Sequence, residues 1–235
     1  MSDDMPRPLI NISDPKTTLR RVEWEPLQEI AYRELRRAIM SARYAPGHMF
    51  TVRATAAALG VSAMPVRAAF SRLVAERAVQ SLENGTVAIP TMSRVRFDDL
   101  VVMRILLEGT AAERAASRIT RPQLTKLKKL AAALAKAVKE NNPIYLDLNQ
   151  SFKFTVCEAA GSPTLEDLVE RLWLQFGPFM HFYAEDIKSL SRTDQYSAVV
   201  DALSRGDAVE AREATAKDII GGAEFIVKVG HFVDP

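Results

Sequence analysis

A single glycine, Gly60, separates two segments whose apolar residues follow helical spacing. The first segment spans about residues 52–59, and glycine is the residue that most readily takes the positive φ of a helix end. Ser62 is a candidate N-cap for the next helix, and Pro65 fits its first turn because a missing N–H costs little there. The buried stripe of that helix is expected at Val66, Phe70 and Leu73. The chain therefore predicts two helices joined by a very short turn.

A helix-turn-helix followed by a β-wing accounts for the segments around this turn. Two helices joined in this way form a helix-turn-helix, whose second helix lies in the major groove of DNA. An amphipathic helix precedes them, starting at Leu27 and ending before Pro46-Gly47. Beyond the motif the pattern changes to that of strands, and Asn84-Gly85 is typical of a two-residue hairpin turn. This part of the chain therefore predicts a winged helix-turn-helix.

Arginine is concentrated in the N-terminal third of the chain. The whole chain carries a formal charge of only +2, which does not by itself indicate a nucleic-acid partner. Between Arg20 and Arg96, however, arginines outnumber the acidic residues. This distribution favours a surface that binds nucleic acid in the same segment as the helix-turn-helix.

Cysteine usage and hydropathy limit the compartment. Cys157 is the chain's one cysteine, so no intrachain disulfide can form, and no spaced set of Cys and His indicates a structural zinc site. Residues 1–15 lack the apolar run of a signal peptide or anchor, and no other stretch approaches a membrane-spanning helix. We therefore expect a cytoplasmic protein with no membrane partner.

From Phe97 onward only helical patterns occur, so the expected fold class is mainly α, a winged helix-turn-helix followed by an all-α helical bundle. Gly177-Pro178 should kink the fourth helix of the bundle, because proline removes a helical donor. The bundle helices are expected at residues 97–120, 122–140, 143–160, 164–188, 194–205 and 207–229. The expected division is a flexible tail at 1–20, the winged helix-turn-helix at 21–90, a linker at 91–96 and the bundle at 97–235.

The string L-G-V-S-x-x-P-V-R-x-A at residues 59–69, followed by a wing, resembles the N-terminal domain of the GntR family of bacterial regulators. The side chains on the N-terminal, solvent-facing side of the second helix are placed to touch base edges and phosphates. The resemblance implies two further DNA-facing residues, Arg53 at the start of the first helix of the helix-turn-helix and Gly85 at the wing tip. The DNA-binding residues expected in this way are Arg53, Ser62, Ala63, Met64, Arg67 and Gly85. The alternative is that the arginines only form a solvated surface.

Ala63 departs from the family pattern, because many relatives carry Arg or Lys there. One phosphate or base contact is therefore missing from the recognition helix. Arg72 or the basic N-terminal tail is a candidate to replace it.

The segments at 102–108, 149–152 and 202–208 resemble motifs of the FadR-like branch of this family, whose C-terminal effector domain is called FCD. The resemblance extends over residues 97–229 and implies a helical domain that binds a small molecule and forms homodimers. Many members of that branch bind a divalent metal through an Asp or Asn and three His. The positions that match this ligand set are Asn149, Lys153, Tyr196 and Asp218. Because no His remains there, we expect neither a metal nor another cofactor.

These positions, together with Arg104, are the candidate effector-binding residues. Lys153 would place an ammonium where a relative holds its metal, so a small organic acid is the expected ligand, with further hydrogen bonds from Arg104, Asn149 and Tyr196. The alternative is that Lys153 pairs with Asp218 and closes the site.

Arg104 has an alternative role of its own. It could instead pair on the surface with Glu108, four residues further along the same helix.

The sequence therefore predicts a transcriptional repressor that binds a short inverted repeat of operator DNA as a homodimer and responds to an effector. A ligand-independent dimeric repressor is the first alternative. The second is an enzyme that uses Lys153, Tyr196 and Asp218, but the chain has no nucleophile elbow, phosphate loop, HExxH or CxxC pattern to support catalysis.

Overall fold

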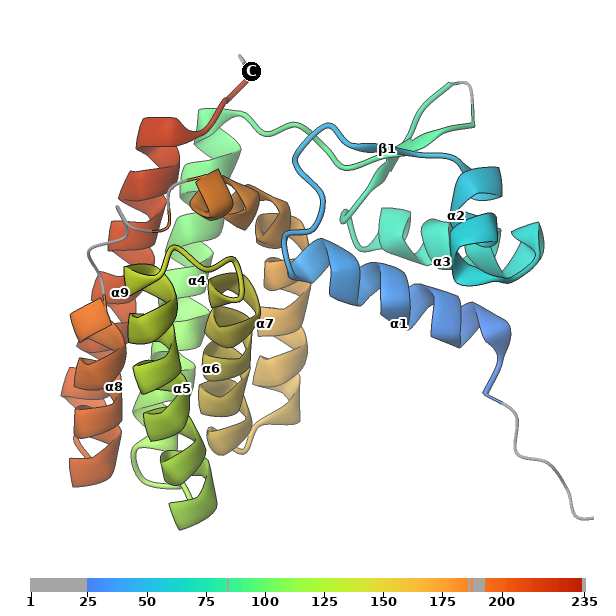
Figure 1. Ribbon diagram of the computed structural model, residues 1–235. Helices are drawn as coiled ribbons and strands as arrows, with labels where there is room; N and C mark the ends of the chain where they lie inside the picture. Colours follow the sequence, from blue (N-terminus) through green and yellow to red (C-terminus); the bar gives the residue numbers. More distant parts are fainter. Residues whose placement is uncertain (1–24, 84, 186, 188–192, 234–235) are drawn as a thin grey trace, which may run out of the picture.

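The computed structural model describes residues 25–83, 85–185, 187 and 193–233, and the expected tail at 1–20 lies outside this range. A small domain with three helices and a short sheet stands beside a larger helical bundle (Figure 1). The predicted fold class, mainly α with a winged helix-turn-helix and a helical bundle, is confirmed. No helix among the described residues is long and apolar enough to cross a membrane.

The N-terminal domain is built as the turn at Gly60 predicts. Gly60 has φ 66° in the left-handed region, so α2 ends there and α3 starts three residues later. Thr51 caps the start of α2, because its hydroxyl accepts a hydrogen bond from the Ala54 N–H at 3.2 Å. The helices are α1 (Leu27–Met40), α2 (Val52–Leu59) and α3 (Ala63–Ala75).

A three-stranded antiparallel sheet completes this domain. Its strands are β1 (Met49–Phe50), β2 (Gln80–Ser81) and β3 (Val87–Ala88), in the order β1-β3-β2. Met49 and Gln80 both pair with Ala88, from opposite sides of the central strand. The sequence did not indicate β1, because a strand of two residues is too short to show an alternating pattern.

The turn of the wing differs from the two-residue hairpin expected at Asn84-Gly85. The Leu82 N–H donates to the Thr86 carbonyl at 2.8 Å, so three residues lie between the paired positions. Gly85 occupies the third of them with φ 74°. A glycine in the left-handed region at this position is typical of a three-residue hairpin loop, and Asn84 itself lies outside the described residues.

The bundle consists of α4 to α9, with a 3₁₀ helix inserted after α7. Figure 1 shows α4 running behind the other helices, and it packs along α9 and also contacts α6 and α7. The segments are α4 (Arg94–Ala115), α5 (Arg121–Lys139), α6 (Tyr145–Ala159), α7 (Pro163–Phe176), η1 (Gly177–Glu185), α8 (Thr193–Arg205) and α9 (Ala208–Val229). Thus α4 begins within the segment expected to be a linker.

The prediction of one kinked helix over 164–188 is wrong, because α7 ends at Phe176. Pro178 cannot donate to the preceding turn, and the chain continues instead as the tighter η1. Gly177, at this change, lies against the end of α1: a Cβ added there would lie 2.9 Å from the Ile39 carbonyl oxygen. The end of α7 therefore forms part of the contact between the two domains.

Two polar contacts hold the same junction. The Arg36 guanidinium on α1 lies 2.7 Å from the Glu170 carboxylate on α7, and both side chains are partly buried. Nδ1 of His181 in η1 lies 3.0 Å from the Ala42 carbonyl oxygen just after α1. The orientation of α1 is thus tied to α7 and η1 of the bundle.

Candidate DNA-binding surface and buried charged cluster

The N-terminal side of α3 is free of packing contacts. Ser62, Ala63, Met64 and Arg67 are exposed, whereas Val66, Ala69, Phe70 and Leu73 are buried on the opposite face. Met64 is 74% exposed, although it is a large apolar residue. An apolar side chain held out in this way can contact a thymine methyl group in the major groove.

Arg53 on α2 and Arg67 on α3 are both exposed, and within the described part of the chain neither guanidinium has an ion-pair or hydrogen-bond partner. Each keeps its donors available for phosphate or a guanine edge. At the wing, nothing lies within 4 Å of a Cβ built on Gly85, so the tip of the turn is open to an approaching backbone.

Arg72 is bound within the domain, so it is a poor candidate to replace the contact that we do not expect from Ala63. Its guanidinium lies 3.7 Å from the centroid of the Tyr32 ring, and its Nη1 lies 3.0 Å from the Glu29 carboxylate. The Tyr32 hydroxyl donates to the Glu76 carboxylate at 2.7 Å. Burial, and then this bond to Glu76, raise the pKa of Tyr32 to about 12. The other candidate, the N-terminal tail, lies outside the described residues.

Four ionisable side chains form a buried cluster at the centre of the bundle, and each is at most 4% exposed. The Lys153 ammonium lies 2.6 Å from the Asp218 carboxylate and 3.5 Å from that of Glu108. Nε of Arg104 donates to Oε1 of Glu108 at 2.7 Å. With all four groups ionised, two positive charges balance two negative charges, as a low-dielectric interior requires.

Aromatic side chains surround one end of this cluster. The Trp173 indole N–H donates to Oε1 of Glu108 at 2.9 Å, and the Arg104 guanidinium lies 4.3 Å from the Phe176 ring centroid. Burial raises the pKa of the Glu108 carboxyl, but the charges of Arg104 and Lys153 outweigh it and hold this pKa below its ordinary value. The guanidinium of Arg104 also loses solvation, and its contacts with Glu108 nevertheless raise its pKa.

A second group of buried polar side chains comes from α6, α8 and η1. Its central member, Asn149, lies one turn of α6 before Lys153. The Tyr196 hydroxyl donates to Oδ1 of Asn149 at 3.0 Å and lies 2.8 Å from the Tyr145 hydroxyl. The Asn149 amide donates to the Met180 sulfur at 3.7 Å. Because Met180 belongs to η1, this group touches the segment that also contacts the end of α1.

The structure thus buries all five candidate effector residues and brings Lys153 to Asp218 and Asn149 to Tyr196. Arg104 reaches the cluster through Glu108. The expectation that Arg104 and Glu108 could pair on the surface is wrong, because their side chains are 4% and 2% exposed.

Sequence reasoning missed Trp173, Tyr145 and Met180 as members of the site. The rule that a buried Trp or Tyr finds a polar partner was the available signal.

Within the described ranges, no group of three or more His, Cys, Asp or Glu side chains is arranged to hold a metal ion.

The outward surface of α4 carries a row of apolar side chains. Val95, Val102, Met103 and Leu106 are between 37% and 72% exposed. Spacings of seven and four residues put Val95, Val102 and Leu106 on one side of the helix, Met103 lies beside them, and the exposed Asp99 interrupts the row. Ile220 on α9, which packs along α4, is 43% exposed. We call these five residues the α4 patch.

Comparison with known proteins agrees with the fold and the exposed recognition helix. Residues 27–89 match the gntR family of bacterial regulatory proteins, and residues 99–220, more than half of the chain, match the FCD domain. The molecule is therefore a DNA-binding transcriptional regulator with an effector-type helical domain, and it is not an enzyme. The chain belongs to the GntR family, among the members that carry an FCD domain.

Individual relatives support this assignment. The chain is 26% identical over 176 residues to the HTH-type transcriptional regulator McbR of Escherichia coli K12. The aligned region covers 73% of this chain and 80% of the relative. The structure of E. coli McbR/YncC superposes with a TM-score of 0.82 at 22% identity, over 87% of this chain and 99% of that one. A protein from Rhodococcus sp. RHA1 described as a GntR transcriptional regulator gives a TM-score of 0.72 at 19% identity, over 87% and 99%.

Proposed function

We propose that this regulator is a cytoplasmic repressor that binds a short inverted repeat as a homodimer and is released by a small organic acid. The observation that carries the DNA-binding part is the row of exposed, unpaired side chains on α3 beside Arg53 of α2. A dimer with two such helices matches a two-fold symmetric operator. Repression follows if the bound dimer covers DNA that the polymerase needs.

The α4 patch is the surface we assign to the dimer. Ion pairs flank the patch along α4, namely Arg94 with Asp98 at 2.9 Å and Glu113 with Arg212 at 2.8 Å. These four charges are neutralised within one subunit, and Asp99 is the charged residue of this side of α4 without an ion-pair partner among the described residues. A second copy of the same apolar row, related by a two-fold axis, is the simplest partner for such a surface.

The effector would bind at the buried cluster around Lys153. Because the four charges there balance, a carboxylate that entered alone would leave one unpaired negative charge in the interior. The acid must therefore bring one proton, which Asp218 can take when the ligand replaces it on Lys153. Asn149 is well placed to transmit this change, because it donates to Met180 of η1.

The 2.6 Å contact between Lys153 and Asp218 favours a second candidate, in which the cluster is closed and the regulator is independent of ligand. In that case the bundle only forms the dimer. The same experiment separates the two candidates.

The test uses an operator duplex selected from random DNA and fluorescence anisotropy with a panel of small organic acids at several pH values. We expect one acid to release the DNA, with its affinity rising about tenfold for each unit of decrease in pH because one proton is bound with it. Asp218→Asn removes the competing carboxylate, so the acid should bind this variant without that pH dependence. Lys217→Met, an exposed neighbour on α9, serves as the control. If no acid binds the wild-type chain, the closed-cluster candidate is correct.

A further inference from the structure

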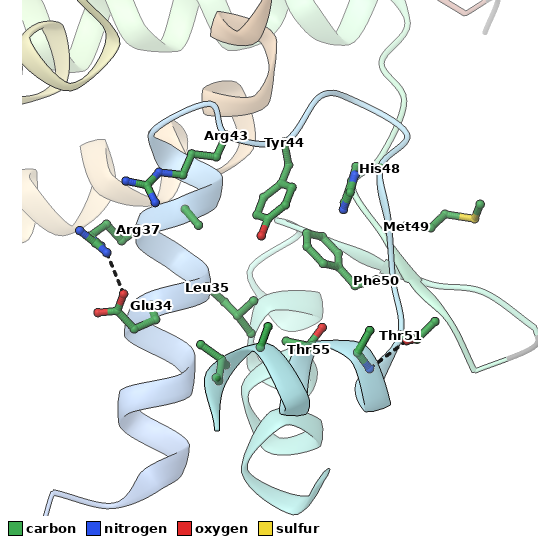
Figure 2. Close-up of a pocket in the computed structure, with 14 residues that line it drawn as sticks. Glu34, Leu35, Arg37, Arg43, Tyr44, His48, Met49, Phe50, Thr51 and Thr55 are labelled. Carbon is green, nitrogen blue, oxygen red and sulfur yellow. Dashed lines mark hydrogen bonds and ion pairs between the residues drawn. The ribbon is translucent and has the colours of Figure 1, made fainter. Parts of the chain in front are cut away.

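A cavity of about 420 Å³ lies in the DNA-binding domain, between α1, the segment 41–51 and α2. Figure 2 shows it bounded by α1 on one side and by α2 below. Its floor is apolar and includes Leu35, Ala38 and Leu59. This volume falls within the range of small-molecule sites, and none of the lining residues belongs to the buried cluster of the bundle.

Three aromatic rings form one wall of the cavity. Tyr44, His48 and Phe50 contact one another with ring centroids 4.6 to 4.8 Å apart. Phe50 is itself fixed by the Phe70 ring of α3, whose centroid lies 5.8 Å away. A rigid aromatic wall favours a flat ligand that can stack on it or meet its edges.

Two hydroxyl groups point into the same space. Figure 2 shows the Tyr44 hydroxyl directed toward α2 and the Thr55 hydroxyl directed toward the rings. Thr55 is only 8% exposed, and among the described residues its side chain and that of Tyr44 have no hydrogen-bond partner. Both hydroxyl oxygens are open to the cavity, so each is available to donate or accept a hydrogen bond with a ligand there.

The rim of the cavity carries one unbalanced positive charge. Arg37 and Glu34 pair at 2.9 Å, so their charges cancel. The remaining cation is Arg43, which is exposed and has no ion-pair partner among the residues that the structure describes. The two arginines and one glutamate that line the cavity therefore leave a net charge of +1.

We propose that this cavity binds a small planar aromatic monocarboxylate. The ring lies against Phe50 and Tyr44, and a ring substituent hydrogen-bonds with Thr55 and Tyr44. The exposed Arg43 side chain, which Figure 2 shows extending over α1 away from the rings, turns toward the cavity and pairs with the carboxylate. This second site is independent of the effector proposed for the bundle. Because α2 forms one wall of the site and packs on α3, the ligand would fix the distance between α1 and the recognition helix.

The test is a fluorescence titration of the full-length protein with 2-naphthoate, an aromatic carboxylate with its own emission. We expect saturable binding to the wild type and at least about tenfold weaker binding to Arg43→Ala, the usual loss when a charge-assisted bond is removed. Ala58→Leu should also abolish binding, because Ala58 lines the cavity and the larger side chain fills it. Both positions are exposed, so the variants are expected to fold.

Two controls, one on α1 and one on α2, make the same kinds of substitution outside the cavity. Arg33→Ala on α1 removes an exposed arginine, and Ala57→Leu on α2 enlarges an exposed alanine, but neither residue lines the cavity. Both controls should bind 2-naphthoate as the wild type does. The proposal is overturned if the wild type shows no saturable binding, or if Arg43→Ala and Ala58→Leu bind with wild-type affinity. These variants leave the bundle unchanged, so the result does not depend on the effector proposed there.

Discussion

Gly177, at the end of α7, lies so close to Met40 of α1 that a Cβ added to it would be 2.9 Å from the Met40 Cα. Its φ of −47° and ψ of −47° are ordinary helical values, so the backbone conformation does not require glycine. Glycine is needed at this position because the contact between the DNA-binding domain and the bundle leaves no space for a Cβ.

Gly177→Ala should therefore displace α1 from the bundle and lower the free energy of unfolding by about 1–3 kcal/mol, as overpacking usually does. Denaturant unfolding measures this change. Gly109→Ala is the matched control, because the nearest atom to a Cβ there is the Cγ of the flexible Arg212 side chain, at 3.3 Å, and the nearest backbone atom is 4.0 Å away. Equal stabilities for the two variants would show that the junction can open without loss.

The pair formed by Lys153 and Asp218 predicts a strongly non-additive set of variants. Lys153→Met should remove the ammonium that lies 2.6 Å from Asp218 and leave the cluster with a net charge of −1, while Arg104 still pairs with Glu108. Asp218→Asn should remove one of the two negative charges and leave a net charge of +1. Removing one member of a buried pair typically costs about 3–5 kcal/mol. The double variant should lose less than the sum of the two, and a double-mutant cycle by urea unfolding measures the difference.

The lowered pKa of Glu108 predicts acid sensitivity. A carboxyl whose pKa is lower in the folded state contributes stability above its unfolded pKa of about 4.3, and this contribution is lost as the pH falls through the folded pKa. The melting temperature of the wild type should therefore fall more steeply below about pH 4.5 than that of Glu108→Gln, which cannot lose this contribution. Parallel melting curves for both proteins would contradict the assignment.

The parts of the fold that depend on local chemistry could be predicted from the sequence. The helix at Val52–Leu59 was predicted closely, because Gly60 ends it with its positive φ. The ends of the bundle helices were likewise marked by proline and glycine. The strand β1 and the η1 segment were not predicted, since pairing with β3 and the contact with α1 come from distant parts of the chain.

The buried cluster shows the same limit. The spacing of Arg104 and Glu108 indicates a pair on one side of a helix, but it does not say whether that side faces water or the core. Only the packing of α4 against α6, α7 and α9 decides it. The role of Trp173 depends on the same packing, because its indole N–H on α7 donates to Glu108 on α4.

The α4 patch predicts that a charge on α4 will separate the subunits. Leu106→Glu should shift the protein from dimer to monomer in sedimentation velocity, because a carboxylate in an apolar interface loses its hydration without gaining a partner. Leu168→Glu on α7 is the control, since Leu168 is 47% exposed, similar to the 44% of Leu106, and lies outside the patch. A dimer that survives Leu106→Glu would place the interface elsewhere.

Arg67 is the residue we expect to contribute most to operator recognition. It is exposed on the recognition helix, and within the described residues its guanidinium has no internal partner that it would have to leave. If it forks onto a guanine edge, Arg67→Ala should weaken specific binding by about 1–3 kcal/mol and relax the preference at one base pair in each half-site.

Arg53→Ala should instead weaken binding to all duplexes about equally and lower the salt dependence, as loss of a phosphate contact does. Anisotropy titrations at several salt concentrations, on the operator and on single-base variants of it, separate the two roles. Arg121→Ala is the control, because Arg121 is an exposed arginine at the start of α5, outside both the recognition helix and the α4 patch. If Arg67→Ala lowers affinity for every duplex by the same factor, Arg67 contacts only the backbone and the sequence is recognised by other residues.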